Sequence, residues 1–228
     1  METQFHRSIL QRIYWIGAVK VISRILLSTF TRRRVTGKEN IPKQGPLLVV
    51  SNHLSFADQF LISICLGRKA VFMAKTEIFR SRIIRHLAHG FGAFPVRRGG
   101  ILDRAALQQA NQVLDSGQAL AMFPEGARNR KAELRRAYPG SAMIALHNNV
   151  PILPIGITGM EHADRKSPLW NLIHLPLVTV TIGRPFHLPP VEGKATKKDL
   201  LRLGDHIMEH IAELLPPKYQ GYYAKHRE

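Results

Sequence analysis

The sequence has a single cysteine in 228 residues, Cys65, which lies in the apolar stretch 60–66. One thiol excludes any disulfide within the chain, so oxidation does not support the fold. A reducing, cytoplasmic setting is compatible with this composition. The chain is 45% hydrophobic and long enough to bury one sizeable core, which fits one domain better than two.

Long uncharged apolar runs are also lacking. The apolar stretch 9–30 is interrupted by Arg12, Lys20 and Arg24, and its longest uncharged run, 13–19, is far shorter than the roughly 20 residues that cross a bilayer. No small-residue cleavage site follows, so we expect no signal peptide. The apolar residues recur at helical spacing opposite the three cations, which predicts a helix lying in the membrane interface.

We therefore expect residues 1–34 to form an amphipathic helical segment that anchors the chain to a membrane. Trp15 and the basic triplet Arg32, Arg33 and Arg34 favour this interpretation, because aromatic rings and cations suit an anionic headgroup region. The alternative is a helix packed on the domain's own core, which is the commoner use of amphipathic helices. The remaining residues, 35–228, show no repeat or linker that divides them.

Acidic residues are scarce. Sixteen Asp and Glu stand against 33 Lys and Arg, a formal net charge of +17. Such an excess implies a polyanionic partner, which is either a nucleic acid or an anionic lipid surface. Composition alone does not choose between the two.

Apolar runs alternate with helix-like patterns along the rest of the chain, which predicts an α/β domain in place of a helix bundle or a β-sandwich. We expect strands at residues 47–51, 70–74, 92–96, 119–123, 152–158 and 178–182. We expect helices at residues 56–66, 78–88, 103–116, 141–148 and 197–215.

The first segment with chemistry is residues 51–58, Ser-Asn-His-Leu-Ser-Phe-Ala-Asp, between a predicted strand and a predicted helix. His53 then lies at the end of the strand and Asp58 in the first helical turn, where the two side chains can meet. A carboxylate on one imidazole nitrogen leaves the other to take a proton from a hydroxyl. The alternative is that Asn52 and Asp58 are ordinary turn and capping residues and His53 is a bystander. No segment indicates a covalent nucleophile, because there is no Gly-x-Ser-x-Gly elbow and Cys65 falls in a predicted helix.

A second segment, Phe-Pro-Glu-Gly-Ala-Arg-Asn-Arg at residues 123–130, also follows a predicted strand. Gly126 permits close approach to the backbone, while Arg128 and Arg130 can bind a phosphate through charge-assisted hydrogen bonds. Glu125 is expected to contact a substrate hydroxyl or to orient those guanidiniums. The alternative is a solvated charged turn.

Two further segments follow the same pattern less strongly. Residues 92–100 place Arg97 and Arg98 beside glycines, which suits an anion, although a solvated basic turn is the alternative. Residues 150–156 form an apolar strand interrupted by two prolines, which restricts its pairing.

These four segments, in this order, resemble the lysophosphatidic acid acyltransferase family, the 1-acylglycerol-3-phosphate O-acyltransferases. The family's first motif, Asn-His followed by four residues and Asp, is matched by Asn52, His53 and Asp58. The proline-containing fourth motif is matched at residues 150–154.

The second and third motifs depart from the family pattern in part. The third, Phe-Pro-Glu-Gly-Thr-Arg-Ser, is matched except that Ala127 replaces Thr and Asn129 replaces Ser. Two hydroxyls are therefore lost, which leaves the phosphate grip and the acceptor open. In the second, Pro-Val-Asp-Arg, Arg98 holds the family's arginine and Arg97 replaces the acid.

The resemblance implies a single α/β acyltransferase domain, with a mixed sheet flanked by helices, behind an amphipathic anchor on the cytoplasmic face of a membrane. It implies acyl-CoA or acyl-carrier protein as donor, a lysophospholipid as acceptor, and neither a metal nor another cofactor. His53 would be the general base and Asp58 its orienting partner. The substrate-binding residues would be Asn52, Lys75, Arg97, Arg98, Glu125, Gly126 and Arg128, with Lys75 polarising the thioester carbonyl or holding donor phosphates.

Other functions stay open at this point. The acceptor could be glycerol 3-phosphate, another lysophospholipid or a glycolipid hydroxyl instead of lysophosphatidic acid. Nucleic-acid binding is motivated by the charge, but no recognised module supports it and we expect no nucleic acid partner. A catalytically silent membrane adaptor on the same fold is the remaining alternative, and the presence of both His53 and Asp58 argues against it.

Overall fold

The computed structural model describes residues 31–80, 93–96, 104–129, 131–161 and 175–226, together with Gly17, Val21, Ile25, Thr29 and Arg85. The expected N-terminal anchor therefore lies almost wholly outside the described residues and stays a prediction. So do Arg97 and Arg98, and most of the helix expected at residues 78–88, whose first residues belong to a short 3-10 helix, Thr76–Arg80.

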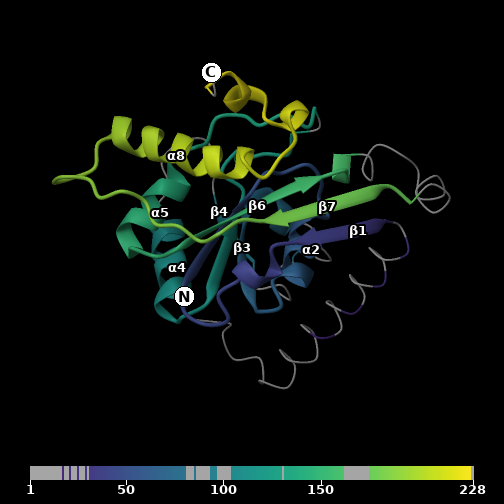
Figure 1. Cartoon of the computed structure of the whole chain (residues 1–228). Coiled ribbons are helices and arrows are strands. Elements are labelled where there is room, and N and C mark those ends of the chain that lie inside the picture. The colour runs from purple at the N-terminus through teal and green to yellow at the C-terminus, as the bar shows by residue number, and fades with distance from the viewer. Residues whose placement is uncertain are drawn as a thin grey trace.

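Seven strands form one mixed sheet in the order β1-β7-β6-β2-β5-β3-β4 (Figure 1). Five neighbouring strands, from β6 to β4, run parallel, and β7 is antiparallel to β6. The strands are β1 Arg32–Thr36, β2 Leu47–Ser51, β3 Ala70–Lys75, β4 Phe94–Val96, β5 Ala119–Met122, β6 Ile152–Thr158 and β7 Leu177–Ile182. The expected mixed α/β sheet is confirmed, and all six expected strands are present within two residues at each end.

Strand β1 was not expected. Arg32 pairs with Leu177 and Thr36 with Thr181, so β1 lies parallel to β7 at one edge of the sheet. Its side chains alternate between exposed and half-buried. The basic triplet expected to belong to the anchor is thus part of the sheet, and the expected boundary between residues 34 and 35 falls inside β1. Edge pairing with β7 holds the three arginines in the sheet, and the division of the chain into an anchor and a domain stays a prediction.

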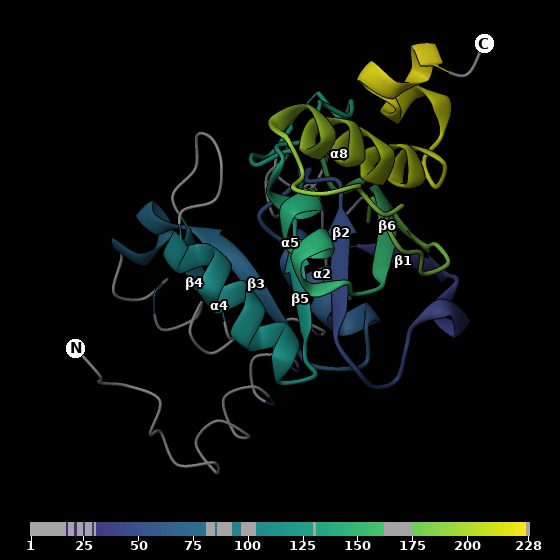
Figure 2. The ribbon, with the colours of Figure 1, turned by 90° about the vertical axis from the view of Figure 1, so that its left-hand side faces the viewer.

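Within the part of the chain that the structure describes, four α-helices cover the sheet. They are α2 Asp58–Cys65, α4 Arg104–Asp115, α5 Gly140–Asn148 and α8 Lys197–Ala212. Helices α4, α5 and α8 lie side by side over one face (Figure 2). A right-handed crossover from β2 to β3 places α2 on the opposite face. Short 3-10 helices at Lys38–Asn40, Pro217–Tyr219 and Gly221–His226 complete the described elements.

The N-terminus of α8 shows why a helix begins where it does. The side chain of Thr196 accepts a hydrogen bond from the N–H of Asp199, and the carboxylate of Asp199 accepts one from the N–H of Thr196. This capping box satisfies two backbone donors that a helix start leaves unpaired.

The core lies around the two central strands β2 and β6. Leu47, Leu48, Val49 and Val50 have no exposed surface, and neither do Ile152, Leu153, Ile155 and Ile157. A parallel strand covered on both faces has no polar side and reads as an unbroken apolar run. Because β2, β3, β4 and β5 run parallel, their carboxyl ends lie along the same side of the sheet, which is called the carboxyl edge below. The expected site segments follow these four strands at the carboxyl edge.

Within the described parts of the chain, none of the helices combines the length and the apolar character needed to cross a membrane.

Candidate active site

Asn52 fastens the end of β2 to β6. Its side-chain amide donates to the carbonyl of Ile157 and accepts from the N–H of Ile157, both at 2.8 Å. Asn52 is buried, so an amide that satisfies one backbone donor and one acceptor together holds the strand end in register. The structure thus shows a structural use for Asn52, and the substrate contact that the motif implies stays a prediction.

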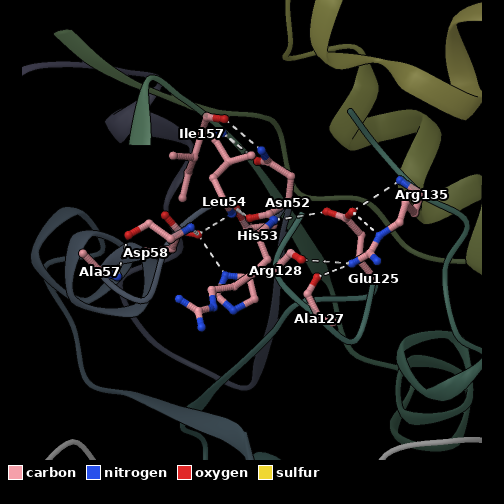
Figure 3. Close-up of polar contacts among 12 residues, drawn as sticks. Asn52, His53, Leu54, Ala57, Asp58, Glu125, Ala127, Arg128, Arg135 and Ile157 are labelled. Carbon is pink, nitrogen blue, oxygen red and sulfur yellow. Dashed lines mark hydrogen bonds and ion pairs between the residues drawn. The ribbon is translucent and has the colours of Figure 1, made fainter. Parts of the chain in front are cut away.

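His53 and Asp58 meet as expected. Nδ1 of His53 lies 2.9 Å from Oδ2 of Asp58, and both side chains are nearly covered (Figure 3). The contact arises because β2 ends at Ser51 and α2 begins at Asp58, so the intervening loop brings the imidazole back over the first helical turn. An imidazole whose Nδ1–H bonds to a carboxylate is fixed in one tautomer, with Nε2 as the basic nitrogen.

The carboxylate of Asp58 is held rigidly. Besides the imidazole, its Oδ2 accepts hydrogen bonds from the N–H of Leu54 at 2.7 Å and of Ser55 at 2.8 Å. Burial raises the pKa of Asp58 above its ordinary value, while the contact with His53 and the two N–H groups act in the opposite direction. Its Oδ1 is buried without a hydrogen-bond partner among the described residues. The loop is therefore shaped around this carboxylate.

The loop after β5 covers the other side of the imidazole. The ring of Phe123 stacks on that of His53, with centroids 3.9 Å apart and planes 10° from parallel. The N–H of Asn129 donates to the carbonyl of His53 at 2.7 Å. Since β5 is the sheet neighbour of β2, the first and third motifs come together at the edge of the sheet.

Glu125 bonds directly to the first motif. Its Oε1 accepts a 3.1 Å hydrogen bond from the N–H of His53, and its Oε2 accepts one of 3.3 Å from the N–H of Arg135. Only 3% of Glu125 is exposed, and this burial raises the pKa of its carboxyl to about 7. The guanidinium of Arg135 lies beside Glu125, with Nε 3.6 Å from Oε2. The expected roles of Glu125, contact with a substrate hydroxyl or orientation of Arg128 and Arg130, stay predictions, and Arg130 lies outside the described residues.

Arg135 is the site residue that the sequence did not predict. Its guanidinium donates to the carbonyl of Ala127 at 2.6 Å and to that of Arg128 at 3.4 Å (Figure 3). The segment that carries it, 131–137, has neither helix nor strand periodicity. No signal in the sequence connects it to a motif that ends several residues earlier.

Both the backbone conformation and the neighbouring side chain at position 126 require glycine. Its φ is +69°, a left-handed conformation that side chains disfavour. A Cβ at this position would lie 2.7 Å from Cδ2 of Tyr138. The turn that presents the exposed side chain of Arg128 therefore depends on glycine.

The two positions that depart from the family pattern also have clear surroundings. Asn129 is buried, and its side chain donates to the carbonyl of Glu133 and accepts from the N–H of Lys131. The amide thus ties the loop to the following segment. Ala127 contributes only its backbone, through the carbonyl that Arg135 binds.

Lys75 is at the end of β3, at the expected edge of the sheet. Its ammonium lies 2.9 Å from the carboxylate of Glu77, and both side chains are substantially exposed. The expected contact of Lys75 with the thioester carbonyl or the phosphates of the acyl donor stays a prediction. No group of three or more His, Cys, Asp and Glu side chains within the described residues is arranged to hold a metal ion.

An α/β sheet with a His–Asp pair at the carboxyl edge, joined to an acidic and basic glycine turn, is the arrangement of an acyltransferase domain. The sequence model of the Acyltransferase family matches residues 32–158, more than half of the chain. The chain belongs to the Acyltransferase family.

Curated relatives give the match more detail. The chain is 28% identical over 158 residues to the 1-acyl-sn-glycerol-3-phosphate acyltransferase of Borreliella burgdorferi, covering 69% of this chain and 58% of the relative. It is 30% identical over 170 residues to a chloroplastic enzyme of the same name from Arabidopsis thaliana, covering 74% and 47%. The chain thus spans about half the length of these relatives.

A solved structure has the same fold. The crystal structure of the 1-acyl-sn-glycerophosphate acyltransferase PlsC from Thermotoga maritima superposes with a TM-score of 0.68 at 24% identity. The superposition covers 92% of this chain and 83% of that one. Because it covers 92% of this chain, the likeness extends beyond the segments that carry the motifs.

Proposed function

We propose that this chain transfers a fatty-acyl group from an acyl thioester, carried by coenzyme A or by acyl-carrier protein, to the free hydroxyl of lysophosphatidic acid. The product would be phosphatidic acid. The observation that carries the proposal is the 2.9 Å contact between His53 Nδ1 and Asp58 Oδ2, inside the motif that the sequence shares with this group of enzymes. The names of the curated relatives support the acceptor.

The reaction takes place in one displacement. Nε2 of His53 accepts the proton of the acceptor hydroxyl as that oxygen attacks the thioester carbonyl carbon. Asp58 stabilises the imidazolium that forms. The tetrahedral intermediate expels the thiolate, the carbon–sulfur bond breaks, and the imidazolium returns its proton to the departing sulfur. No acyl-enzyme forms, because the attacking atom belongs to the acceptor.

The acceptor phosphate would lie on the turn after β5. Gly126 lets it approach the backbone, and the exposed guanidinium of Arg128 supplies charge-assisted hydrogen bonds. Arg97 and Arg98, which directly follow β4 in the sequence, would add positive charge to this binding site. Lys75 would hold donor phosphates or polarise the thioester carbonyl. Asn52 would act through the position of His53, because both of its polar ends are bonded to Ile157.

The site would work at an anionic membrane surface on the cytoplasmic face, with residues 1–34 as the anchor. Val21 and Ile25, four residues apart and so on one helical face, are 57% and 58% exposed. Each basic residue near an anionic surface contributes on the order of 1 kcal/mol to binding. Deleting residues 1–30 should release the protein from phosphatidylglycerol vesicles without changing its circular dichroism. Full retention on vesicles after the deletion would exclude this anchor.

The activity is tested by acyl transfer from a radiolabelled long-chain acyl-CoA, and in parallel from acyl-carrier protein, to a panel of acceptors. The panel contains lysophosphatidic acid, other lysophospholipids, glycerol 3-phosphate and a glycolipid. His53→Ala is compared with His147→Ala, which removes an exposed imidazole on α5. Product from lysophosphatidic acid that is lost only in His53→Ala supports the proposal. Faster transfer to another molecule of the panel would identify that molecule as the acceptor, in place of lysophosphatidic acid. No transfer by the folded protein on vesicles would overturn the proposal that the chain is an enzyme.

A further inference from the structure

The turn after β5 lacks two hydroxyls that the family motif supplies, at Ala127 and Asn129, yet it is held in a defined shape. Asn129 is bonded to Glu133 and Lys131, and the carbonyls of Ala127 and Arg128 accept hydrogen bonds from one guanidinium. That guanidinium belongs to Arg135, eight residues beyond Ala127. The geometry of the turn therefore depends on a residue outside the motif.

We propose that Arg135 is a positioning residue for acyl transfer, which joins Glu125 to the carbonyls of Ala127 and Arg128 so that the turn keeps the shape that receives the acceptor phosphate. This inference rests on the proposed function. Arg135 acts through Glu125 and the turn, and it is not itself expected to touch the substrate.

Three contacts support this role. The Nη2 atom of Arg135 donates to the carbonyl of Ala127 at 2.6 Å and to that of Arg128 at 3.4 Å. Its Nε lies 3.6 Å from Oε2 of Glu125, whose other oxygen binds the N–H of His53. A planar guanidinium can bridge groups in this fixed geometry, whereas an ammonium is a point donor. One side chain therefore connects the turn to the residue that bears the imidazole.

The backbone that presents Arg135 is itself fixed by the C-terminal segment. The N–H of Leu134 donates to the carbonyl of Tyr219 at 2.9 Å, and the carbonyl of Leu134 accepts from the N–H of Tyr222 at 3.0 Å. Gly221 lies against the backbone of Leu134 so closely that a Cβ would not fit. Arg135 thus extends from an anchored segment, and its side chain is 48% exposed.

A purely electrostatic role is a weaker explanation. An ion pair with a partner that is 48% exposed contributes little, because water screens it. The backbone N–H of Arg135 also bonds to Glu125 whatever its side chain. Replacing the Arg135 side chain therefore removes, above all, its hydrogen bonds to the carbonyls of Ala127 and Arg128.

Arg136 supplies a matched control. It is adjacent in sequence, 52% exposed, and forms a 2.6 Å ion pair with Asp205 of α8 while lying over the ring of Tyr222. Arg135→Gln and Arg136→Gln each remove one guanidinium and one positive charge from the same surface. Only the first removes contacts with the turn.

The test measures steady-state kinetics of the full-length protein on vesicles with lysophosphatidic acid and a long-chain acyl-CoA. Arg135→Gln should raise KM for the acceptor by roughly tenfold or more, with a smaller change in KM for the donor. Arg135→Lys should recover part of the loss, since an ammonium can reach one carbonyl but cannot bridge all three groups. Arg136→Gln should leave both constants within about twofold of the unmodified protein. Equal effects of the two glutamine variants, or none from Arg135→Gln, would overturn the proposal.

A second measurement separates this inference from the proposed function. In the full-length protein with 13C-labelled glutamate side chains, the carboxyl of Glu125 is followed by NMR during a pH titration and assigned with Glu125→Gln. Its midpoint should move upward in Arg135→Gln, because Arg135 favours the charged form, and stay near the native value in Arg136→Gln. An unchanged midpoint would show that Arg135 does not hold Glu125. Absence of acyl transfer in the unmodified protein with a shifted midpoint would instead refute the proposed function alone.

Discussion

The N–H of His53 donates a 3.1 Å hydrogen bond to Oε1 of Glu125, a residue 72 positions later in the chain. This bond joins the loop after β2 to the turn after β5. The position of the imidazole is consequently set from two directions, by the carboxylate of Asp58 on its ring and by the carboxylate of Glu125 on its backbone. Replacing either carboxylate should therefore change the position of the His53 imidazole and slow acyl transfer.

The pH dependence of the free energy of unfolding should reflect the titration of the Glu125 carboxyl. Its pKa is raised to about 7 in the folded protein, above the ordinary value of 4.5. The folded state then binds a proton more tightly than the unfolded state, so Glu125 favours folding at low pH and this contribution is lost as pH rises toward 7. The loss amounts to about 3 kcal/mol in total.

Glu125→Gln keeps the shape and one of the two acceptor oxygens but cannot titrate. We expect its free energy of unfolding, measured by urea at pH 4.5 to 8, to lack this fall. The difference between the two curves isolates Glu125 from the other titrating groups. Parallel curves would show that this carboxyl titrates alike in the folded and unfolded states.

Gly126→Ala should destabilise the protein through both strain and overlap. The backbone has a φ of +69°, and the new methyl group would lie 2.7 Å from the ring of Tyr138. We expect a loss of roughly 1–3 kcal/mol of unfolding free energy and a higher KM for the acceptor.

Gly193→Ala is the matched control, because Gly193 has a φ of +68° and no neighbour within 4 Å of a Cβ. It should show only the backbone cost, about 1 kcal/mol, and native kinetics. If the two variants lose equal stability, contact with Tyr138 is not what restricts position 126.

Asn52→Ala should act on stability far more than on substrate affinity. The change removes two buried 2.8 Å hydrogen bonds and leaves the N–H and carbonyl of Ile157 unpaired. A loss of about 2–4 kcal/mol follows. Chemical denaturation and KM for both substrates check this. A large rise in KM with native stability would instead support the substrate contact that the motif implies.

The sequence predicts the central sheet well because the physics there is simple. Strands β2 and β6 are recovered with their observed bounds, since strands buried on both faces must be apolar throughout. The meeting of His53 and Asp58 follows from a strand, a short loop and a helix start. These are local features, and periodicity detects them.

The elements that the sequence did not predict depend on distant partners. Strand β1 carries three arginines and is a strand only because β7, about 145 residues later, offers an edge. Arg135 lies in an irregular segment whose course is set by Tyr219 and Tyr222 near the C-terminus. Charge and periodicity contain no information on such pairings, so the sequence alone predicts a membrane anchor at the basic triplet and gives no indication of Arg135.

The most direct test of the account is a single-turnover experiment with excess protein, radiolabelled acyl donor and lysophosphatidic acid, stopped by rapid quenching. The account predicts that labelled phosphatidic acid forms without labelled protein at any time. It also predicts that His53→Ala and Asp58→Asn slow this step by about 100-fold or more while the protein stays folded. A labelled acyl-enzyme, or turnover in His53→Ala at the native rate, would contradict the role of the His53–Asp58 pair.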